Sequence, residues 1–297
     1  SLYYFCTNHT SMVQEFKVRR PNHFVDLNST VDLEMIWVEP GTFTMGMEGA
    51  NNATPEHNVT LSAGFYLGKY EVTQAQYEAV MVNNTVGLNA TPSNWPNNPN
   101  RPIDKISWED IQVFLELLNE QESASIPEGW AYALPTEAQW ELACRAGTSS
   151  FYWWGDEINS THANYNWDGD WNTGNDFRMT RDVGQYSPNP WGFYDMTGNV
   201  WELTADWHAG YTSDSQVDPE QLSGTQVVWR GGSWSDNTDR QKSSFRSYIF
   251  PNLRPTDQGF RLALRKVPHV VDLNSTVDLE MIWVEPGTFT MGSPTTE

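Results

Sequence analysis

Apolar and polar residues alternate at several places along the chain and predict short β-strands. The first such run extends from Leu33 to Met45 and is interrupted at Pro40-Gly41, which predicts a hairpin. A second run, from Asn58 to Leu67, predicts a further strand. Three short strands are predicted towards the C-terminus, over 227–233, 243–248 and 259–264.

Three segments combine helical spacing with capping residues. One helix opens at Thr73, which caps it. A second follows Ser107, whose capping box has Asp110 in place of the preferred Glu, and runs to about Glu122 with Ile111, Phe114, Leu115 and Leu118 on its apolar face. A third follows Thr136, turns Trp140, Leu142 and Ala143 inward, and ends at Gly147.

Regular periodicity fades between Ser149 and Ser223, where Trp, Asn, Asp and Gly are frequent. Large aromatic residues can bury such a segment, so we expect irregular but folded backbone. The pattern as a whole predicts an α+β domain with helices early in the chain and little regular secondary structure elsewhere.

A long segment of the chain occurs twice. Residues 25–46, VDLNSTVDLEMIWVEPGTFTMG, return unchanged at 271–292. The interval of 246 residues (271 minus 25) fits one large domain better than a solenoid repeat. We therefore expect an N-terminal arm at 1–24, one domain at 25–267 and a duplicated opening segment at 268–297.

Two interpretations of the duplicate stay open. In the first, it is the opening strand of a following module in a tandem array. In the second, it takes the place of the identical segment in a neighbouring subunit and builds a filament.

The charge of the chain limits its partners. Its 17 Lys and Arg stand against 38 Asp and Glu, giving a formal net charge of −21. Such a charge repels phosphate backbones, so nucleic acid is not an expected partner. With 13% aromatic residues a substantial core is expected, and no apolar run reaches the roughly 18 residues of a membrane span.

Eight N-x-S/T sequons are roughly double the number that chance predicts for this composition. Several are expected to carry glycans, with unmodified solvated loops as the alternative. Together with a first residue that is not Met, they favour a secreted, extracellular or cell-surface protein. The sequon residues are Asn8, Asn28, Asn52, Asn58, Asn83, Asn89, Asn159 and Asn274.

A series of blocks between residues 34 and 265 carries a family resemblance: MIWVEPGTFTMG, FYLGKYEVTQAQY, PIDKISWEDIQVF, LPTEAQWELACRAG, NPWGFYDMTGNVWELTADW, VVWRGGSW, FRS and GFRLA. In this order they resemble the formylglycine-generating enzyme (sulfatase-modifying factor) domain family. The resemblance implies that family's low-regularity α+β fold, which is related to C-type lectins. It does not imply the activity, because the same fold serves several functions.

The chain departs from the catalytic pattern of that family. Catalytic members have two cysteines just after the GGS motif, where thiolates hold copper for the oxidation of a substrate cysteine. Here the stretch reads GGSWSDNTDRQKSSFRS, and no cysteine follows Ser149. We therefore expect neither copper nor the oxidase activity, and the six His show no metal-ligand spacing.

Two calcium sites are implied by the resemblance. The first falls in DMTGNVWE, where Asp195 and Glu202 offer carboxylates and the turn at Gly198 directs the carbonyls of Gly198 and Val200 inward. Its alternative is a tight turn whose Glu202 bonds backbone amides. The second and weaker set is Asn164 and Tyr165 with Asn175, Asp176 and Phe177.

The chain has two cysteines, Cys6 and Cys144. Relatives pair a cysteine in the position of Cys144 with one in a GFRC motif, where this chain has Leu262. Cys6 is then the remaining candidate partner, and a Cys6–Cys144 disulfide and two buried thiols are equally compatible with the sequence.

Most tryptophans fall in the family blocks and are expected in the core, whereas Trp167 and Trp171 lie outside the blocks and are candidates for exposure. In binding members of the family the segment after GGSW forms the ligand surface. The corresponding candidates here are Trp234, Asp236, Asn237, Asp239 and Arg240, with a solvated loop as the alternative.

These observations favour a non-catalytic, secreted and glycosylated structural or adhesive module that self-associates through the duplicated segment. The first alternative is a C-type-lectin-like surface protein with a glycan or protein ligand. The second is a divergent oxidase of the family, which would retain copper or iron through purification.

Overall fold

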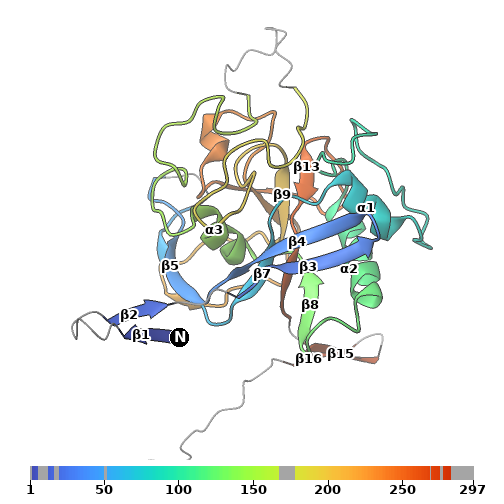
Figure 1. Cartoon of the computed structure of the whole chain (residues 1–297), viewed down its shortest axis with the longest axis horizontal. Coiled ribbons are helices and arrows are strands. Elements are labelled where there is room, and N and C mark those ends of the chain that lie inside the picture. The colour runs from blue at the N-terminus through green and yellow to red at the C-terminus, as the bar shows by residue number, and fades with distance from the viewer. Residues whose placement is uncertain are drawn as a thin grey trace, which may run out of the picture.

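The computed structural model describes residues 20–49, 52–166 and 178–267, together with the strand positions of 2–5, 13–16, 269–274 and 277–281. The domain is α+β, as predicted, and helices cover both faces of its central five-stranded sheet (Figure 1). In sheet order the strands are β3 (His23–Asn28), β4 (Val31–Val38), β7 (Phe65–Gly68), β14 (Ala263–Lys266) and β8 (Trp130–Ala133).

Two smaller sheets complete the domain. One contains, in order, β12 (Arg246–Ile249), β11 (Val227–Arg230), β9 (Trp201–Trp207) and β13 (Gln258–Phe260). The other contains β10 (Gln216–Val217), β6 (His57–Leu61) and β5 (Gly41–Met45). Separate hairpins are formed by β1 (Leu2–Phe5) with β2 (Val13–Phe16), and by β15 (His269–Asn274) with β16 (Val277–Met281).

The described residues form three α-helices, each with the N-cap that the sequence predicts. They are α1 (Gln74–Met81), α2 (Trp108–Gln121) and α3 (Glu137–Arg145), and a short 3₁₀ helix, η1, spans Thr238–Gln241. In each α-helix the side chain of the N-cap accepts from the N3 backbone, and the N3 side chain bonds back to the cap. Asp110 therefore completes the box at Ser107 although it is shorter than Glu.

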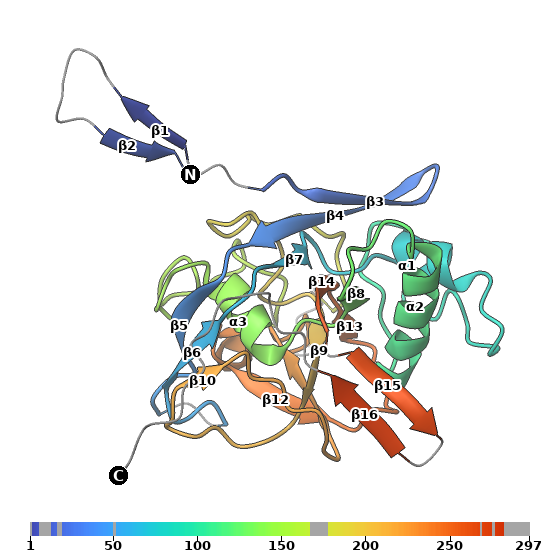
Figure 2. The ribbon, with the colours of Figure 1, turned by 90° about the horizontal axis from the view of Figure 1, so that it is seen from below.

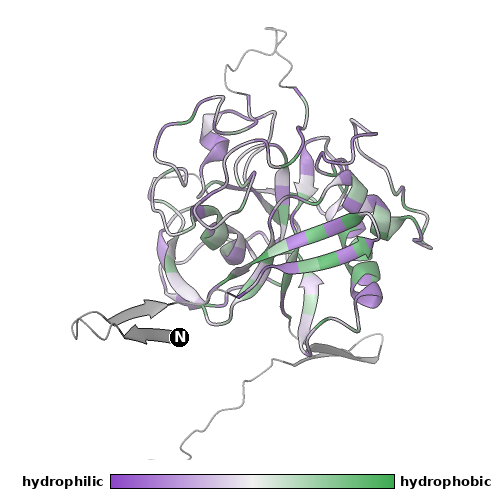
Figure 3. Cartoon of the chain, viewed as in Figure 1, coloured by the Kyte–Doolittle hydropathy of each residue, from purple (hydrophilic) through white to green (hydrophobic). Residues whose placement is uncertain are grey.

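The helices divide the core into two parts. Helices α1 and α2 pack with the hairpin β3–β4, where Tyr77 and Phe114 stack with ring centroids 5.4 Å apart. Helix α3 packs on the other side with β5, β6 and β7, around the fully buried Trp140. Apolar residues are prominent on β3, β4 and α2 (Figure 3). None of the helices in the described ranges is long and apolar enough to cross a membrane.

The predicted hairpin over 33–45 is wrong. Strand β4 pairs with β3 and β7, whereas β5 pairs with β6 in another sheet, because the chain changes direction at Pro40. The predicted strand over 58–67 is likewise two strands, β6 and β7, with Gly64 between them. A Cβ at Gly64 would lie 2.2 Å from the Trp37 ring, so only glycine fits this close approach.

Strands β3, β8 and β9 are not predicted from the pattern. Strand β9 lies inside the segment expected to be irregular, and it shows no alternation because Trp201, Glu202, Leu203 and Thr204 are all buried. Strand β3 begins at His23, two residues before the expected boundary at Val25.

Candidate functional site

The segment after β11 folds back sharply. Gly231 and Gly232 have φ angles of 90° and 70°, in the left-handed region that favours glycine. A Cβ at Gly232 would lie 2.7 Å from the Gln241 amide, so glycine allows η1 to pack against the turn. The candidate ligand surface is thus held on a tight backbone loop.

Ser233 is the centre of a hydrogen-bonded cluster in this loop. Its hydroxyl lies 2.6 Å from an Asp236 oxygen and 3.0 Å from an Asp257 oxygen, and the Ser235 hydroxyl donates to Asp257 at 2.8 Å. Arg240 donates to the other Asp236 oxygen at 2.8 Å. Burial raises the pKa of Asp236, and the bonds from Ser233 and Arg240 partly offset this rise.

The predicted ligand residues divide by exposure. Asn237, Asp239 and Arg240 are exposed on η1 and its cap. Asp236 is buried in the cluster, and Trp234 is half-buried, edge-on to Trp95 at 5.3 Å. The exposed surface available to a ligand is therefore narrower than the sequence suggests.

A buried ion network underlies this loop and is not predicted by the sequence pattern. The fully buried Arg230 pairs with Glu141 and with Glu137 (3.0 Å), and donates to the carbonyl of Ser243 at 2.9 Å. Arg145 pairs with Glu141 at 2.8 Å. Because Arg230 binds two carboxylates of α3 and a carbonyl of the loop, it joins the helix to the candidate surface.

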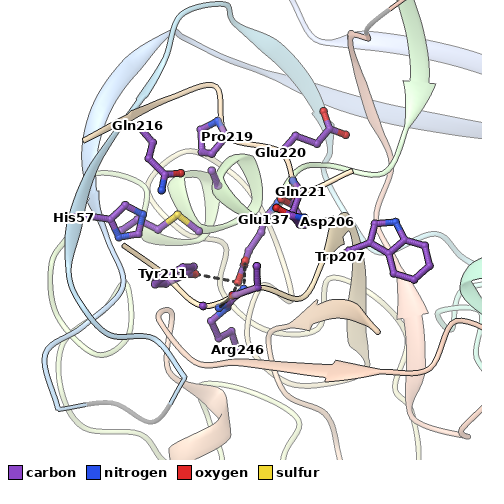
Figure 4. A pocket seen from close by; sticks show the side chains of 14 residues that line it. His57, Glu137, Asp206, Trp207, Tyr211, Gln216, Pro219, Glu220, Gln221 and Arg246 are labelled. Carbon is purple, nitrogen blue, oxygen red and sulfur yellow. Dashed lines mark hydrogen bonds and ion pairs between the residues drawn. The ribbon is translucent and has the colours of Figure 1, made fainter. Parts of the chain in front are cut away.

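Glu137 also borders a polar pocket of about 220 Å³ (Figure 4). Arg246 contacts this carboxylate with two nitrogens at 2.7 Å, and the Tyr211 hydroxyl donates to it at 3.0 Å. Arg246 and Arg230 hold the pKa of Glu137 below its usual value despite burial. Asp206 lies beside Glu137 and accepts from its backbone N–H at 2.7 Å (Figure 4), and burial and the Glu137 charge raise the pKa of Asp206 to about 7.

Comparisons with known proteins decide the family. Residues 25–266 match the family of the sulfatase-modifying factor enzyme 1-like domain. The chain belongs to this family. The resemblance seen in the sequence blocks is confirmed.

The relatives of this sulfatase-modifying factor-like chain include proteins named as a chaperone and as an enzyme. It is 29% identical to the chaperone protein LppX of Paenibacillus barcinonensis, over 80% of this chain and 92% of that protein. It is 28% identical to the formylglycine-generating enzyme of Mus musculus, over 79% of this chain and 76% of the enzyme.

The fold is shared with solved structures. Variable protein 1 of Treponema denticola superposes with a TM-score of 0.68 at 26% identity, covering 82% of this chain and 99% of that one. PvdO of Pseudomonas aeruginosa shares the fold with a TM-score of 0.65 at 24% identity, over 83% and 99% of the two chains.

The copper chemistry of the family depends on thiolates. Cys144, the cysteine that lies within the described residues, is fully buried on α3. Among the described residues Cys144 has no disulfide partner, and its Sγ donates to the Met196 carbonyl at 3.6 Å. Burial raises the pKa of Cys144 to about 11, so the thiolate is scarce at neutral pH. Cys6 lies outside the described residues, and its pairing with Cys144 stays a prediction.

The first calcium set is engaged by protein groups. Arg261 contacts the two Glu202 oxygens at 2.8 and 3.0 Å, and the Trp140 indole donates to Glu202 at 2.7 Å. Asp195 accepts from the Gly184 N–H at 2.6 Å, and burial raises its pKa to about 6. Because a guanidinium already neutralises Glu202, this carboxylate does not fit a calcium ligand in this arrangement.

The structure places the turn of the first set against the second set. Gly198 forms a bridge with Asn164, and the Asn199 N–H donates to the Asn164 carbonyl at 2.8 Å. The Asn164 side-chain oxygen is buried without a hydrogen-bond partner among the described residues, although its amide donates to Met179 and Asn199. Such an orphan oxygen fits a cation ligand. Tyr165 is buried beside it, whereas Asn175, Asp176 and Phe177 lie outside the described residues.

Within the described ranges, no three His, Cys, Asp or Glu side chains are grouped as a metal site. A site built on Asn164 would draw its carboxylate from Asp176, which lies outside the described residues, so this finding does not bear on it. Calcium at either set stays a prediction, and the orphan oxygen favours the second.

Chelation tests this preference. With calcium about 100-fold above its Kd, we expect EDTA to lower the melting temperature by about 5–10 °C, because a ligand of the folded state alone contributes about 2.7 kcal/mol at that ratio. Asn164→Ala should abolish the difference, whereas Asp195→Asn should keep it. Identical melting curves of the parent protein in calcium and in EDTA would exclude both sites.

Of the described tryptophans, only Trp140 and Trp201 are fully buried and the others are half-buried, so the expectation that most lie in the core is met only in part. Trp201 is buried and stacks on Trp229 with centroids 4.7 Å apart, and Trp140 is buried on α3. Trp167 and Trp171 lie outside the described residues.

Proposed function

We propose that this chain is a non-catalytic structural or adhesive module of the sulfatase-modifying factor-like family, which acts outside the cell, carries N-linked glycans and associates with copies of itself through the duplicated segment. The observation that carries the proposal is the match between two hairpins. Strands β15 and β16 pair in the register of β3 and β4, with Val271 opposite Leu279 where Val25 lies opposite Leu33. Even the register irregularity between Asp26 and Asn28 recurs.

The absence of thiolates supports a non-catalytic role. No cysteine follows Ser149, and the loop after Gly232 instead contains a cluster in which serines and Arg240 bond the carboxylates of Asp236 and Asp257. These hard oxygen groups do not select Cu(I).

The positions of the sequons support glycosylation and hence a secreted protein. The sequon asparagines in the described ranges are all exposed, at Asn28, Asn52, Asn58, Asn83, Asn89 and Asn159. Asn8 and Asn274 lie where side chains are not described. A net charge of −21 is also compatible with extracellular solubility.

A ligand-binding role is the second candidate, favoured by the exposed Asn237, Asp239 and Arg240 on η1. A protein or glycan ligand would be recognised by saturable binding that Arg240→Ala weakens.

Removal of the duplicate tests the proposed function. The full chain should form oligomers as its concentration rises, whereas a chain ending at Pro268 should remain monomeric at every concentration. Sedimentation velocity measures the species, electron microscopy shows whether they are filaments, and intact mass before and after glycosidase treatment measures the glycans. Oligomers that persist without residues 269–297 would contradict self-association through the duplicate.

A further inference from the structure

The duplicated sequence coincides with a unit of the fold that has defined contacts at both ends. His269 repeats His23, the first residue of β3, whose ring nitrogen lies 2.9 Å from the Tyr132 hydroxyl. The identity ends at Gly292, which repeats Gly46. The Gly46 N–H donates to Glu141 at 2.9 Å, and the Gly46 carbonyl accepts from Arg145 at 2.8 Å. The copy thus repeats the sequence of β3, β4 and β5, including the two residues that make the end contacts in 23–46.

The only difference between 23–46 and 269–292 lies on the surface. Phe24, which is 63% exposed, is replaced by Val270. The hairpin residues that enter the core are unchanged in the copy: Val25, Leu27, Leu33 and Met35 correspond to Val271, Leu273, Leu279 and Met281. The sequence of the copy therefore meets every requirement of the site that residues 23–46 fill.

The unit lies at the periphery of the domain. Strand β3 is the edge of the five-stranded sheet, and β5 is the edge of the three-stranded sheet. Strand β4 is joined to the rest of its sheet through β7 alone, and Figure 2 shows β3 and β4 along the border of the domain. The whole unit can therefore separate from β7 and β6 without threading through the fold.

We propose that residues 269–292 of one copy occupy the site of residues 23–46 in a second copy, so that two identical segments compete for one site. This inference rests on the proposed self-association and specifies where it occurs. Each copy donates its C-terminal segment and accepts one from a neighbour. The contact is head-to-tail, and it extends into a filament where its rotation does not close a ring.

The competition has a definite physical consequence. The incoming segment forms the same hydrogen bonds and apolar packing that the resident segment gives up, so exchange itself contributes little free energy. The resident segment also has the advantage of its tether, equivalent to an effective concentration of about 1 mM. A substitution that weakens binding of the resident segment alone therefore increases the fraction of sites that the incoming copy occupies.

Matched substitutions in the full chain test this competition. Leu33→Asp places a charge in the core through the resident segment and should lower the concentration for half-assembly at least about 30-fold, roughly the smallest shift that loss of a buried leucine gives. Leu279→Asp, the same change in the copy, should give a monomer with native stability. Leu33→Asp combined with Val270→Asp should still assemble, because Val270 copies the exposed Phe24. Sedimentation velocity measures each variant.

The double variant Leu33→Asp/Leu279→Asp separates exchange from nonspecific aggregation. It should not assemble and should melt at a lower temperature, because neither segment can fill the site. Assembly of this double variant equal to that of Leu33→Asp would overturn the proposal. A Leu33→Asp chain that stays monomeric would also overturn the proposal, whether the chain is unfolded or has folded with its own residues 269–292 in the site.

The two proposals fail differently. If the parent chain stays monomeric at all concentrations while Leu33→Asp assembles, self-association of the parent is wrong and the competition stands. If the parent assembles and Leu279→Asp leaves that assembly unchanged, the competition is wrong.

Discussion

Replacing Arg230 with methionine is expected to lower the free energy of unfolding by about 3–5 kcal/mol. The guanidinium is fully buried and neutralises Glu141 and Glu137, which are buried on α3. Methionine fills similar volume, and in the described ranges it leaves these carboxylates with Arg145 and Arg246 alone as cationic partners. Urea unfolding followed by tryptophan fluorescence measures the loss.

Arg240→Met is the matched control for this change. Arg240 pairs with Asp236 at 2.8 Å, but its side chain is 54% exposed, so water screens the pair. The loss should stay below about 1 kcal/mol. Equal losses for the two variants would show that burial of the Arg230 network does not determine its contribution.

Replacing Arg261 with methionine is expected to destabilise the domain by a similar amount, about 3–5 kcal/mol, and to do so more at pH 8 than at pH 5. Arg261 is fully buried, bonds both oxygens of Glu202 and donates to the carbonyls of Gly68 (2.9 Å) and Tyr194 (2.8 Å). Its charge also opposes the rise in the pKa of Glu71 and Asp195, which lie near Glu202.

The sign of the pH effect follows from these pKa values. Burial raises the pKa of Glu71 and raises that of Asp195 to about 6. A carboxyl whose pKa is raised on folding contributes stability below its unfolded pKa and loses it as pH rises through the folded value. Loss of Arg261 raises both pKa values further, so the penalty grows above pH 6.

Arg265→Met provides the control for the pH effect. Arg265 pairs with Glu220, which is 18% exposed, and no further carboxylate is paired with it in the described ranges. Its loss should be smaller and nearly the same at pH 5 and pH 8. A pH-independent loss for Arg261→Met would contradict the electrostatic account of the Glu202 cluster.

The local signals in the sequence predict the helices well and the sheets poorly. Thr73, Ser107 and Thr136 determine helix starts because an N-cap acts within three residues of itself. The strands on either side of Pro40 were predicted to pair with each other, but they enter different sheets. Strand pairing depends on partners such as β7 and β6, which lie further along the chain.

The candidate site shows the same division. The missing thiolates, the exposed η1 residues and the DMTGNVWE turn can be read from the sequence. The ion pair between Arg261 and Glu202 cannot be read from the sequence. The two residues are 59 positions apart and meet only when β13 pairs with β9. The charged residues of α3 were a signal that was available, since Glu137, Glu141 and Arg145 share a helix with buried Trp140.

The sequence by itself determined the family, the α+β class, the helix caps, the absence of the thiolate pair and the duplicated segment, because each is written in contiguous residues. The tertiary structure alone decided which charges are buried, that Glu202 bonds Arg261, that the Asn164 oxygen has no partner in the described part of the chain, and that residues 23–46 form a peripheral unit. These features depend on distant segments brought into contact, where burial sets the energy of every charge and hydrogen bond.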